Sequence, residues 1–499
     1  MLTPHTEPLD AAQARHLLAR ATFSADPAGV EAATGRVAAD VVREWMALRQ
    51  DSWFLIEPSW MGTLYPPSGV PNEEVQAFLQ TNAYYIDEVR SAWLGELLGG
   101  GLRNRMALFW HNHFVTDFQK YRYAPLAFRY VRLLQSSAFG FLPQFAKQMG
   151  REGSMLYYLD GRYSTRTAPN ENYARELMEL FTMGPVDENG DPNYTQADIA
   201  EAARALTGYR MNVRDQWTSY HQRSLFDATP KTIFGRTGDF GADEFVDLLF
   251  QERPVQIARF ISRKLIHELV HVEPEPVAVH ALADRFIASD FNLGELLVEL
   301  LGSEYFFDQR FLGARIKSPV ELMALPFSMG GTLTEAQTAT ALYKTEQLGQ
   351  TLLSPPNVAG WPGHRAWLNT DLLPRRWSES EWIAGLVLSP AEWQALVAAL
   401  SGGASYPAVD FPLRLAEMLF SVPLEFVSIP SLDEPFAGDL TRSPLPDDLI
   451  TGPAHRINLV KLFLSGTPWY EWNPLSNLGV IRIVNYVREL ARLPEFQLS

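Results

Sequence analysis

The fold class follows from two stretches of this 499-residue chain, NENYARELMELFTMG at residues 170–184 and YTQADIAEAARALTGYR at residues 194–210. Starting at Ala174, apolar residues recur at positions i, i+3, i+4 and i+7, which is the spacing of one buried face of an α-helix. In the second stretch, Thr195 and Asp198 have the spacing of an N-terminal capping box, and small and apolar residues follow at helical intervals. The two stretches therefore predict a helical hairpin.

Helical spacing of apolar residues extends over most of the chain. Met106, Trp110 and Phe114 repeat at every fourth position, and residues 243–304 carry another long helical pattern. Residues 209–241 alternate more and contain aromatic and threonine residues, which favours one short β-hairpin. The expected fold is mainly α: a large multi-helix globular domain with long loops and at most a small β-hairpin.

The sequence predicts one large helical domain or two closely packed ones, with an interruption near the end of the chain. Residues 1–400 are expected to form a helical core, and residues 456–499 to add C-terminal helices that complete the same core. Between them, residues 401–455 hold many Pro, Gly, Ser and Asp residues. That composition predicts a loop-rich insertion.

Charge and cysteine content exclude several classes of function. The formal net charge of −16 repels a phosphate backbone and no Lys/Arg-rich run offsets it, so we expect no nucleic-acid partner. The chain has no Cys, which rules out disulfides, thiolate metal ligands and a cysteine nucleophile. Motifs for nucleotide binding, dinucleotide binding, serine hydrolases and EF-hands are also missing.

Two features of the sequence bear on its location. No window offers about 18 uninterrupted apolar residues, so we expect no membrane span. Residues 1–23 lack the basic start and apolar run of a signal peptide. As printed, the chain is therefore expected in the cytoplasm.

Several phrases of the sequence, taken together, resemble one bacterial protein family. Their order and spacing along nearly the whole chain are similar to those of DUF1800, a family of unknown function, and LPEFQ at residues 493–497 also resembles the way those proteins finish. Beside the helical hairpin, the phrases are MALFWHNHF at residues 106–114, FISRKL at 260–265, RIKSPVELM at 315–323 and PPNVAGWPGHRAWLN at 355–369.

The resemblance implies no settled activity. Relatives are frequently encoded beside another uncharacterised family that looks like sulfatases, which implies a sulfatase-like partner protein or a role on modified polysaccharides. Many relatives also carry an export signal, so a natural chain with such a leader would be exported.

The phrase WHNHF supplies His111 and His113 as candidate metal ligands or general bases. In an extended backbone, two histidines two positions apart can share a metal ion. In a helix their side chains point about 200° apart, which puts His113 on the apolar stripe of Met106 and Trp110 and His111 off it. The alternative is a core histidine hydrogen-bonded to the backbone.

Glu171, Arg175 and Glu179 are spaced i, i+4 and i+8 along one edge of the first helix of the hairpin. They form either an exposed ladder of ion pairs or, with His111 and His113, the wall of a polar cleft. In the cleft, Glu171 and the two histidines would be the ligands of a divalent metal ion, and Arg175 an anion clamp.

Asp227 is a further candidate site residue. Relatives often show a His-Asp pair before the positions of Lys231 and Gly235, whereas this chain has Phe226 before the aspartate. The missing imidazole weakens a metal site at this position. Asp227 and Lys231 form either a buried ion pair or part of the active site.

His267, Glu268 and His271 match H-E-x-x-H, the motif of zinc peptidases, and Glu295 lies in range as a third ligand. The predicted helix, however, places its apolar stripe, which includes Leu265, on the side opposite both histidines. In a zinc peptidase the histidines of this motif point into a buried cleft. The alternative is that His267 and His271 face solvent near the C-terminal end of the helix, where the helix dipole favours them.

Trp361, His364 and Trp367 lie in a Gly/Pro-rich segment that cannot form a regular helix. Aromatic residues on a rigid loop either stack on sugars and peptides or close the edge of a core.

These candidates favour an enzyme or ligand-binding protein with a polar cleft of His, Glu and Arg, acting on a modified polysaccharide or a similar substrate. The sequence leaves open whether the chain is an enzyme. One alternative is a non-catalytic partner or scaffold protein, in which the family phrases are packing and interface motifs. The other is a zinc metallopeptidase through residues 267–271.

Overall fold

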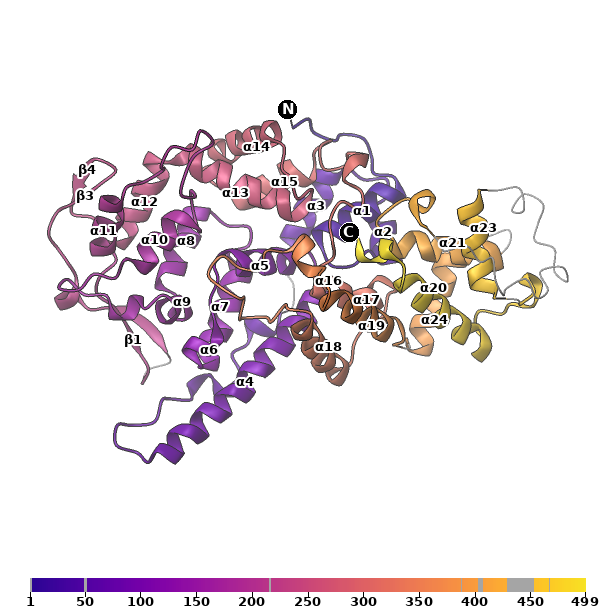
Figure 1. Cartoon of the computed structure of the whole chain (residues 1–499), viewed down its shortest axis with the longest axis horizontal. Helices are drawn as coiled ribbons and strands as arrows, with labels where there is room; N and C mark the ends of the chain where they lie inside the picture. Colours follow the sequence, from indigo (N-terminus) through magenta and orange to yellow (C-terminus); the bar gives the residue numbers. More distant parts are fainter. Residues whose placement is uncertain are drawn as a thin grey trace.

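The computed structural model describes residues 2–48, 52–214, 217–386, 388–402, 407–428, 453–465 and 467–499. Within these ranges the regular structure is almost entirely helical, and the strands form two small antiparallel pairs (Figure 1). The expectation of a mainly α fold is therefore confirmed. No helix in the described ranges is both long and apolar enough to pass through a lipid bilayer.

The helices of the first half of the chain are α1 (Ala11–Ala21), α2 (Pro27–Ala33), α3 (Ala38–Ala47), α4 (Asn72–Gly99), α5 (Leu102–His113), α6 (Phe118–Tyr121), α7 (Ala124–Ser136), α8 (Leu142–Arg151), α9 (Gly153–Tyr158), α10 (Glu171–Glu179), α11 (Gln196–Ala205) and α12 (Ala242–Glu252).

Those of the second half are α13 (Pro254–Leu269), α14 (Pro276–Ala288), α15 (Leu293–Leu301), α16 (Pro319–Met323), α17 (Leu325–Ser328), α18 (Glu335–Gln347), α19 (Leu372–Ala384), α20 (Pro390–Ser401), α21 (Pro407–Leu419), α23 (Ala454–Leu464) and α24 (Asn477–Ala491). Short 3₁₀-helices are η1 (Trp53–Leu55), η2 (Ser59–Gly62), η3 (Gly161–Tyr163), η4 (Arg223–Leu225), η5 (Gln309–Phe311), η6 (His364–Trp367), η7 (Leu424–Phe426), η9 (Trp469–Glu471) and η10 (Pro494–Gln497).

Figure 1 shows an elongated arrangement with α5 near its middle. Helices α8 to α12 and the strands lie at one end, α20, α21, α23 and α24 lie at the other, and the first half of α4 projects from the body. Helix α5 packs against α3, α4 and α7, and α13 packs against α12 and α14. The chain's last residues run beside residues 315–317, since the Lys317 N–H donates to the carbonyl of Gln497.

The helical hairpin predicted from the sequence is present as α10 and α11, which pack against each other. The Asn170 side chain caps α10 by accepting from the N–H of Asn172. Thr195 and Asp198 form the capping box of α11, each side chain accepting a backbone N–H of the other residue. The start signals of both helices therefore act as their residue types predict.

The stretch at residues 209–241 holds two hairpins, where the sequence predicted at most one. Strand β1 (Tyr209–Asn212) pairs with β2 (Thr218–His221), and β3 (Lys231–Ile233) pairs with β4 (Arg236–Gly238), both antiparallel. The second turn has positive φ at both central residues, 51° at Phe234 and 76° at Gly235, which is the type I′ geometry of tight hairpins. Phenylalanine rarely adopts this conformation, so the sequence did not indicate a turn here.

Part of the stretch predicted as a loop-rich insertion, residues 401–455, is helical. Residues 407–419 form α21, which packs against α20 and α23 and buries Phe411 and Leu415. A proline at position 412 lies inside this helix, which explains why its composition resembles that of a loop. Residues 429–452 of the predicted insertion lie outside the described residues.

Helix α5 is buried on almost every side, so its polar side chains lie in the core. Arg105, His111 and His113 are exposed to 1%, 0% and 2%. Polar groups without water must find partners in the protein, because an unpaired buried donor or charge costs folding free energy. The partners of these three residues position the candidate site.

A loop at residues 353–361 closes over the C-terminal end of α5. The Asn112 Oδ1 accepts from the Trp361 N–H at 2.7 Å, and the Asn112 Nδ2 donates to the Trp361 carbonyl at 3.3 Å. Gly360 allows this approach: its φ is +88°, and a Cβ there would lie 2.3 Å from Asn112 Oδ1 and 2.5 Å from the Asn112 carbonyl. Only glycine fits at this position.

We predict that Gly360→Ala lowers the free energy of unfolding, measured by urea titration, by roughly 2–4 kcal/mol, because it adds a clash to left-handed strain. The matched control is Gly190→Ala, where φ is +85° and no atom lies within 4 Å of the added Cβ. That control should lose only about 1 kcal/mol. Equal losses in the two variants would contradict the close packing of the loop on α5.

Candidate functional site

His111 is a structural residue of the core with no free ring nitrogen. Its Nε2 accepts from the Leu353 N–H at 3.1 Å, so its Nδ1 carries the proton and donates to the Tyr130 hydroxyl at 2.9 Å. That hydroxyl in turn donates to the Phe114 carbonyl at 2.7 Å. Burial lowers the pKa of His111 to about 3, so the ring is neutral. The arrangement matches the core-histidine alternative rather than a ligand.

His113 is also buried, but it lies at the wall of a cavity. Its Nε2 donates to the Phe181 carbonyl at 3.0 Å, which leaves Nδ1 to accept from the Lys264 ammonium at 3.0 Å. Burial, and then the charge of Lys264, lower the pKa of His113 well below its usual range. A neutral imidazole therefore holds the end of a lysine side chain.

The charged residues of α10 do not reach these histidines. Arg175 Nη2 donates to Glu171 Oε2 at 3.1 Å, and Gln196 Nε2 donates to the same oxygen at 2.8 Å. Glu179 accepts from the Tyr194 hydroxyl at 3.0 Å. These groups form a partly exposed ladder between α10 and the start of α11, as the local alternative predicted. No hydrogen bond or ion pair of the described residues joins Glu171, Arg175 or Glu179 to either histidine.

Asp227 belongs to another cluster, beside the strands. Arg204 Nε donates to Asp227 Oδ2 at 2.8 Å, and Lys231 Nζ donates to the carbonyl of Asp227 at 2.6 Å. Although burial opposes it, hydrogen bonds from Arg204 and Thr229 hold the pKa of the Asp227 carboxyl well below its usual range. Asp227 therefore ties a loop to α11 through Arg204.

The H-E-x-x-H segment does not present two histidines on one helical face. Helix α13 ends at Leu269, so His271 lies beyond it. His267 Nδ1 donates to the Val272 carbonyl at 2.9 Å, and His271 Nδ1 contacts the backbone of Glu273. Glu295 lies exposed in the first turn of α15.

No group of three or more His, Asp and Glu side chains among the described residues is arranged to hold a metal ion. Neither set of ligands expected from the sequence, His111 with His113 and Glu171 or His267 with His271 and Glu295, is brought together. His111 and His113 each have both ring nitrogens bonded, and Glu171 lies in its surface ladder. Each of the three would have to leave existing partners to bind a metal ion.

A cavity of about 310 Å³ lies between α5 and α13. Its size is at the lower end of the range for small-molecule sites. Its lining includes residues of the WHNHF phrase, of FISRKL and of the H-E-x-x-H segment. From the sequence alone these were separate candidates. We call it the α5–α13 cavity, and it is lined by Phe109, Asn112, His113, Arg263, Lys264, His267, Glu268, Val272 and Pro274.

Lys264 is the residue of this cavity that sequence reasoning missed. It is partly buried, and burial lowers its pKa to about 8. Its ammonium group lies 5.3 Å from the ring centroid of Phe260 and donates to His113. The sequence feature that could have indicated Lys264 is its place in the FISRKL phrase, one position from the apolar stripe of the helix.

A buried ion network forms the wall behind Glu268. Arg105 donates to Glu268 from Nη2 and to Glu321 of α16 from Nη1, both at 2.9 Å. Arg315 Nη2 adds a bond of 3.4 Å to the same oxygen of Glu268. Burial opposes ionisation of Glu321, but Arg105 and Arg315 lower its pKa to about 2. Sequence reasoning also missed this network, although Arg105 stands at an apolar-stripe position of α5, one turn before Phe109.

The GWPGH segment reaches the same neighbourhood. Trp361 packs edge-on against His111, with ring centroids 5.3 Å apart, so it closes the edge of the core. His364 has φ of 46°, and its buried Nδ1 has no partner among the described residues. Burial, then the charges of Arg365, His267 and Arg315, lower the pKa of His364. A strained histidine surrounded by positive charge thus lies near the cavity.

Comparison with known proteins identifies the lineage. A family model described as "Protein of unknown function (DUF1800)" matches residues 16–444. "Myb-like protein V" of Dictyostelium discoideum is 29% identical over 160 residues, which cover 31% of this chain and 18% of that protein. The chain thus spans less than a fifth of that relative. No solved structure matches the chain.

The family match includes α5, the FISRKL and RIKSPVELM phrases and the GWPGH loop, which the structure gathers around one buried network. Because it covers most of the sequence, the chain belongs to the DUF1800 family.

Proposed function

We propose that the chain binds a small anionic substrate in the α5–α13 cavity and that Lys264 contacts the anion. The observation that carries the proposal is the state of the Lys264 ammonium group. It donates to a neutral His113, and no carboxylate of the described residues pairs with it. A partly buried cation of this kind gains the counter-ion it lacks when an anion binds.

The other charges around the cavity favour the same ligand. Arg263 adds a second positive charge at the rim, where it pairs with Glu188 at 3.3 Å. The one carboxylate of the lining, Glu268, is already engaged by Arg105 and Arg315. The lining therefore carries the cations Arg263 and Lys264 against the single carboxylate Glu268, which favours an anion over a cation as the ligand.

The geometry also supports acid–base chemistry. A pKa of about 8 leaves part of the Lys264 population as a free amine near neutral pH, and a free amine acts as a base or a nucleophile. His113 is a positioning residue, since its Nδ1 fixes the direction of the lysine and its Nε2 is bonded to the backbone. In this proposal the chain is an enzyme, and the side-chain amine of Lys264 exchanges a proton with the bound substrate.

Sulfated or carboxylated sugars are the substrates to test first. They combine an anion for Lys264 with hydroxyl groups that the Asn112 side chain and His267 at the cavity wall can contact. The frequent neighbourhood of related genes with sulfatase-like ones favours the same class and a sulfatase-like partner protein. A non-catalytic scaffold has no requirement for an anion in this cavity, so ligand binding distinguishes the two functions.

Anion binding should depend on pH. Protonated Lys264 binds the anion, so the affinity for sulfate, measured by calorimetry, should be constant from about pH 6 to about pH 7 and fall by roughly tenfold per unit above pH 8. Lys264→Met should abolish binding, and Lys264→Arg should retain it at high pH, because arginine stays protonated.

The exposed Lys120 provides the matched control, since Lys120→Met should leave sulfate affinity unchanged. The same titration with a sulfated monosaccharide and its unsulfated parent tests the substrate class. Wild-type sulfate affinity in the Lys264→Met protein, or an affinity that does not change between about pH 8 and about pH 10, contradicts the proposal.

A Glu268→Gln variant distinguishes the proposed anion-binding function from the zinc-peptidase alternative. In a peptidase Glu268 would be the general base, and Glu268→Gln would abolish cleavage while preserving the fold. In the structure Glu268 neutralises Arg105, so the same change should lower the free energy of unfolding by roughly 1–3 kcal/mol.

Glu171→Gln is the matched control, because Glu171 makes only a partly exposed ion pair and should change stability by less than about 0.5 kcal/mol. Thermal and urea unfolding measure both variants. A Glu268→Gln protein as stable as the wild type that has lost a peptidase activity would favour the alternative.

A further inference from the structure

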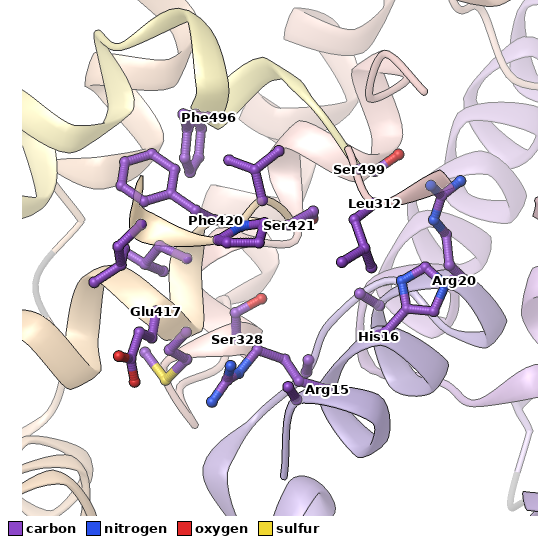
Figure 2. Close-up of a pocket in the computed structure, with 18 of the residues that line it drawn as sticks. Arg15, His16, Arg20, Leu312, Ser328, Glu417, Phe420, Ser421, Phe496 and Ser499 are labelled. Carbon is purple, nitrogen blue, oxygen red and sulfur yellow. The ribbon is translucent and has the colours of Figure 1, made fainter. Parts of the chain in front are cut away.

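A second cavity lies on the other side of the ion network from the α5–α13 cavity. It has a volume of about 600 Å³ and is bounded by α1, by α17 and by residues 417–425, which form the end of α21 and the segment after it (Figure 2). We call it the α1–α21 cavity. Its volume is within the range of sites that enclose a small organic ligand.

One end of this cavity is lined by Arg20 and by a carboxylate that is already engaged. The Glu321 side chain accepts from Arg105 at 2.9 Å and lies 3.6 Å from Arg315. Two arginines outside the lining therefore share the carboxylate that stands beside Arg20.

Arg20 is a buried cation with few partners. It is 1% exposed and lines the cavity. Its Nη2 donates to the Phe311 carbonyl at 2.8 Å, but its Nε and Nη1 have no partner among the described residues. A buried guanidinium with two unused donor atoms is costly unless an anion completes its surroundings.

His16 lies one turn before Arg20 on α1 and lines the same end. Its Nε2 donates to the Phe306 carbonyl at 3.1 Å, so in the neutral ring Nδ1 remains an acceptor. Lys317 also lines the cavity but lies beside Phe496: its Nζ donates to the Phe496 carbonyl at 2.8 Å and lies 4.2 Å from the centroid of that ring.

The opposite side of the cavity is apolar. Figure 2 shows the rings of Phe420 and Phe496 across from Arg20 and His16. Leu419 and Leu424 add to the same wall, and both are buried. A ligand that fills the whole cavity must therefore have an apolar body and an anionic head.

At the remaining side, Arg15 and Glu417 face each other. Burial lowers the pKa of Arg15, while the charges of Glu417 and Asp10 oppose that shift. Arg15 therefore has two carboxylates close to it on this side of the cavity.

We propose that the α1–α21 cavity is a second ligand site, which takes a single-chain amphiphile whose carboxylate, sulfate or phosphate head pairs with Arg20 and whose apolar chain packs on Phe420 and Phe496. This site is distinct from the α5–α13 cavity and independent of the function proposed for it. Its head-group end and Lys264 lie on opposite sides of the Arg105 network.

The test compares two probes of equal chain length on the unmodified protein. Calorimetry should show decanoate binding with a stoichiometry of one and at least about tenfold more tightly than decyltrimethylammonium, because only the first carries the anion that Arg20 needs. Equal affinities, or no binding of either probe, overturn the proposal.

Two variants assign the site. Arg20→Met keeps most of the buried volume and should reduce decanoate affinity to that of the cationic probe, whereas Arg15→Met should not. Ser328→Trp, at the partly exposed wall, should block both probes without touching Arg20. If the folded Arg20→Met protein keeps its preference for decanoate, the assignment is wrong.

Sedimentation with phosphatidylglycerol vesicles separates a free amphiphile from a lipid in a bilayer. The proposal expects decanoate to bind and the vesicles to leave the protein in solution. Binding to vesicles without binding of decanoate overturns it.

Discussion

The structure depends on one buried guanidinium. Arg105 lies on α5, the helix that is enclosed by the rest of the molecule, and it is 1% exposed. Its charge is tolerable only because Glu268 of α13 and Glu321 of α16 both accept from it. Through these two bonds the central helix fixes the positions of two others, and the walls of both cavities follow from that placement.

The same network separates two environments. Glu268 faces the α5–α13 cavity and Glu321 lines the α1–α21 cavity, so each carboxylate is taken up by arginines before it can neutralise another cation. Lys264 on one side and Arg20 on the other are left with neutral or carbonyl partners. Each cavity is therefore lined by a cation that no carboxylate of the described residues pairs with.

The helices and the local ion pairs could be predicted from the sequence, because both depend on short spacings. The caps of α10 and α11 and the alternative reading of Glu171 and Arg175 as an exposed pair are of this kind. The site could not, since its bonds join Arg105 to residues 163 and 216 positions away. Spacing in the sequence also suggested His111 as a metal ligand. Only the three-dimensional structure shows that both of its ring nitrogens are hydrogen-bonded to other residues.

A double-mutant cycle between Arg105 and Glu321 is the most direct measurement of this dependence. The free energy of unfolding is measured for the wild type, Arg105→Met, Glu321→Gln and the double variant. Each single change leaves a buried group without its partner, so we expect a coupling energy of about 2 kcal/mol or more. A coupling energy below about 0.5 kcal/mol, the range of exposed ion pairs, would contradict the central role of the network.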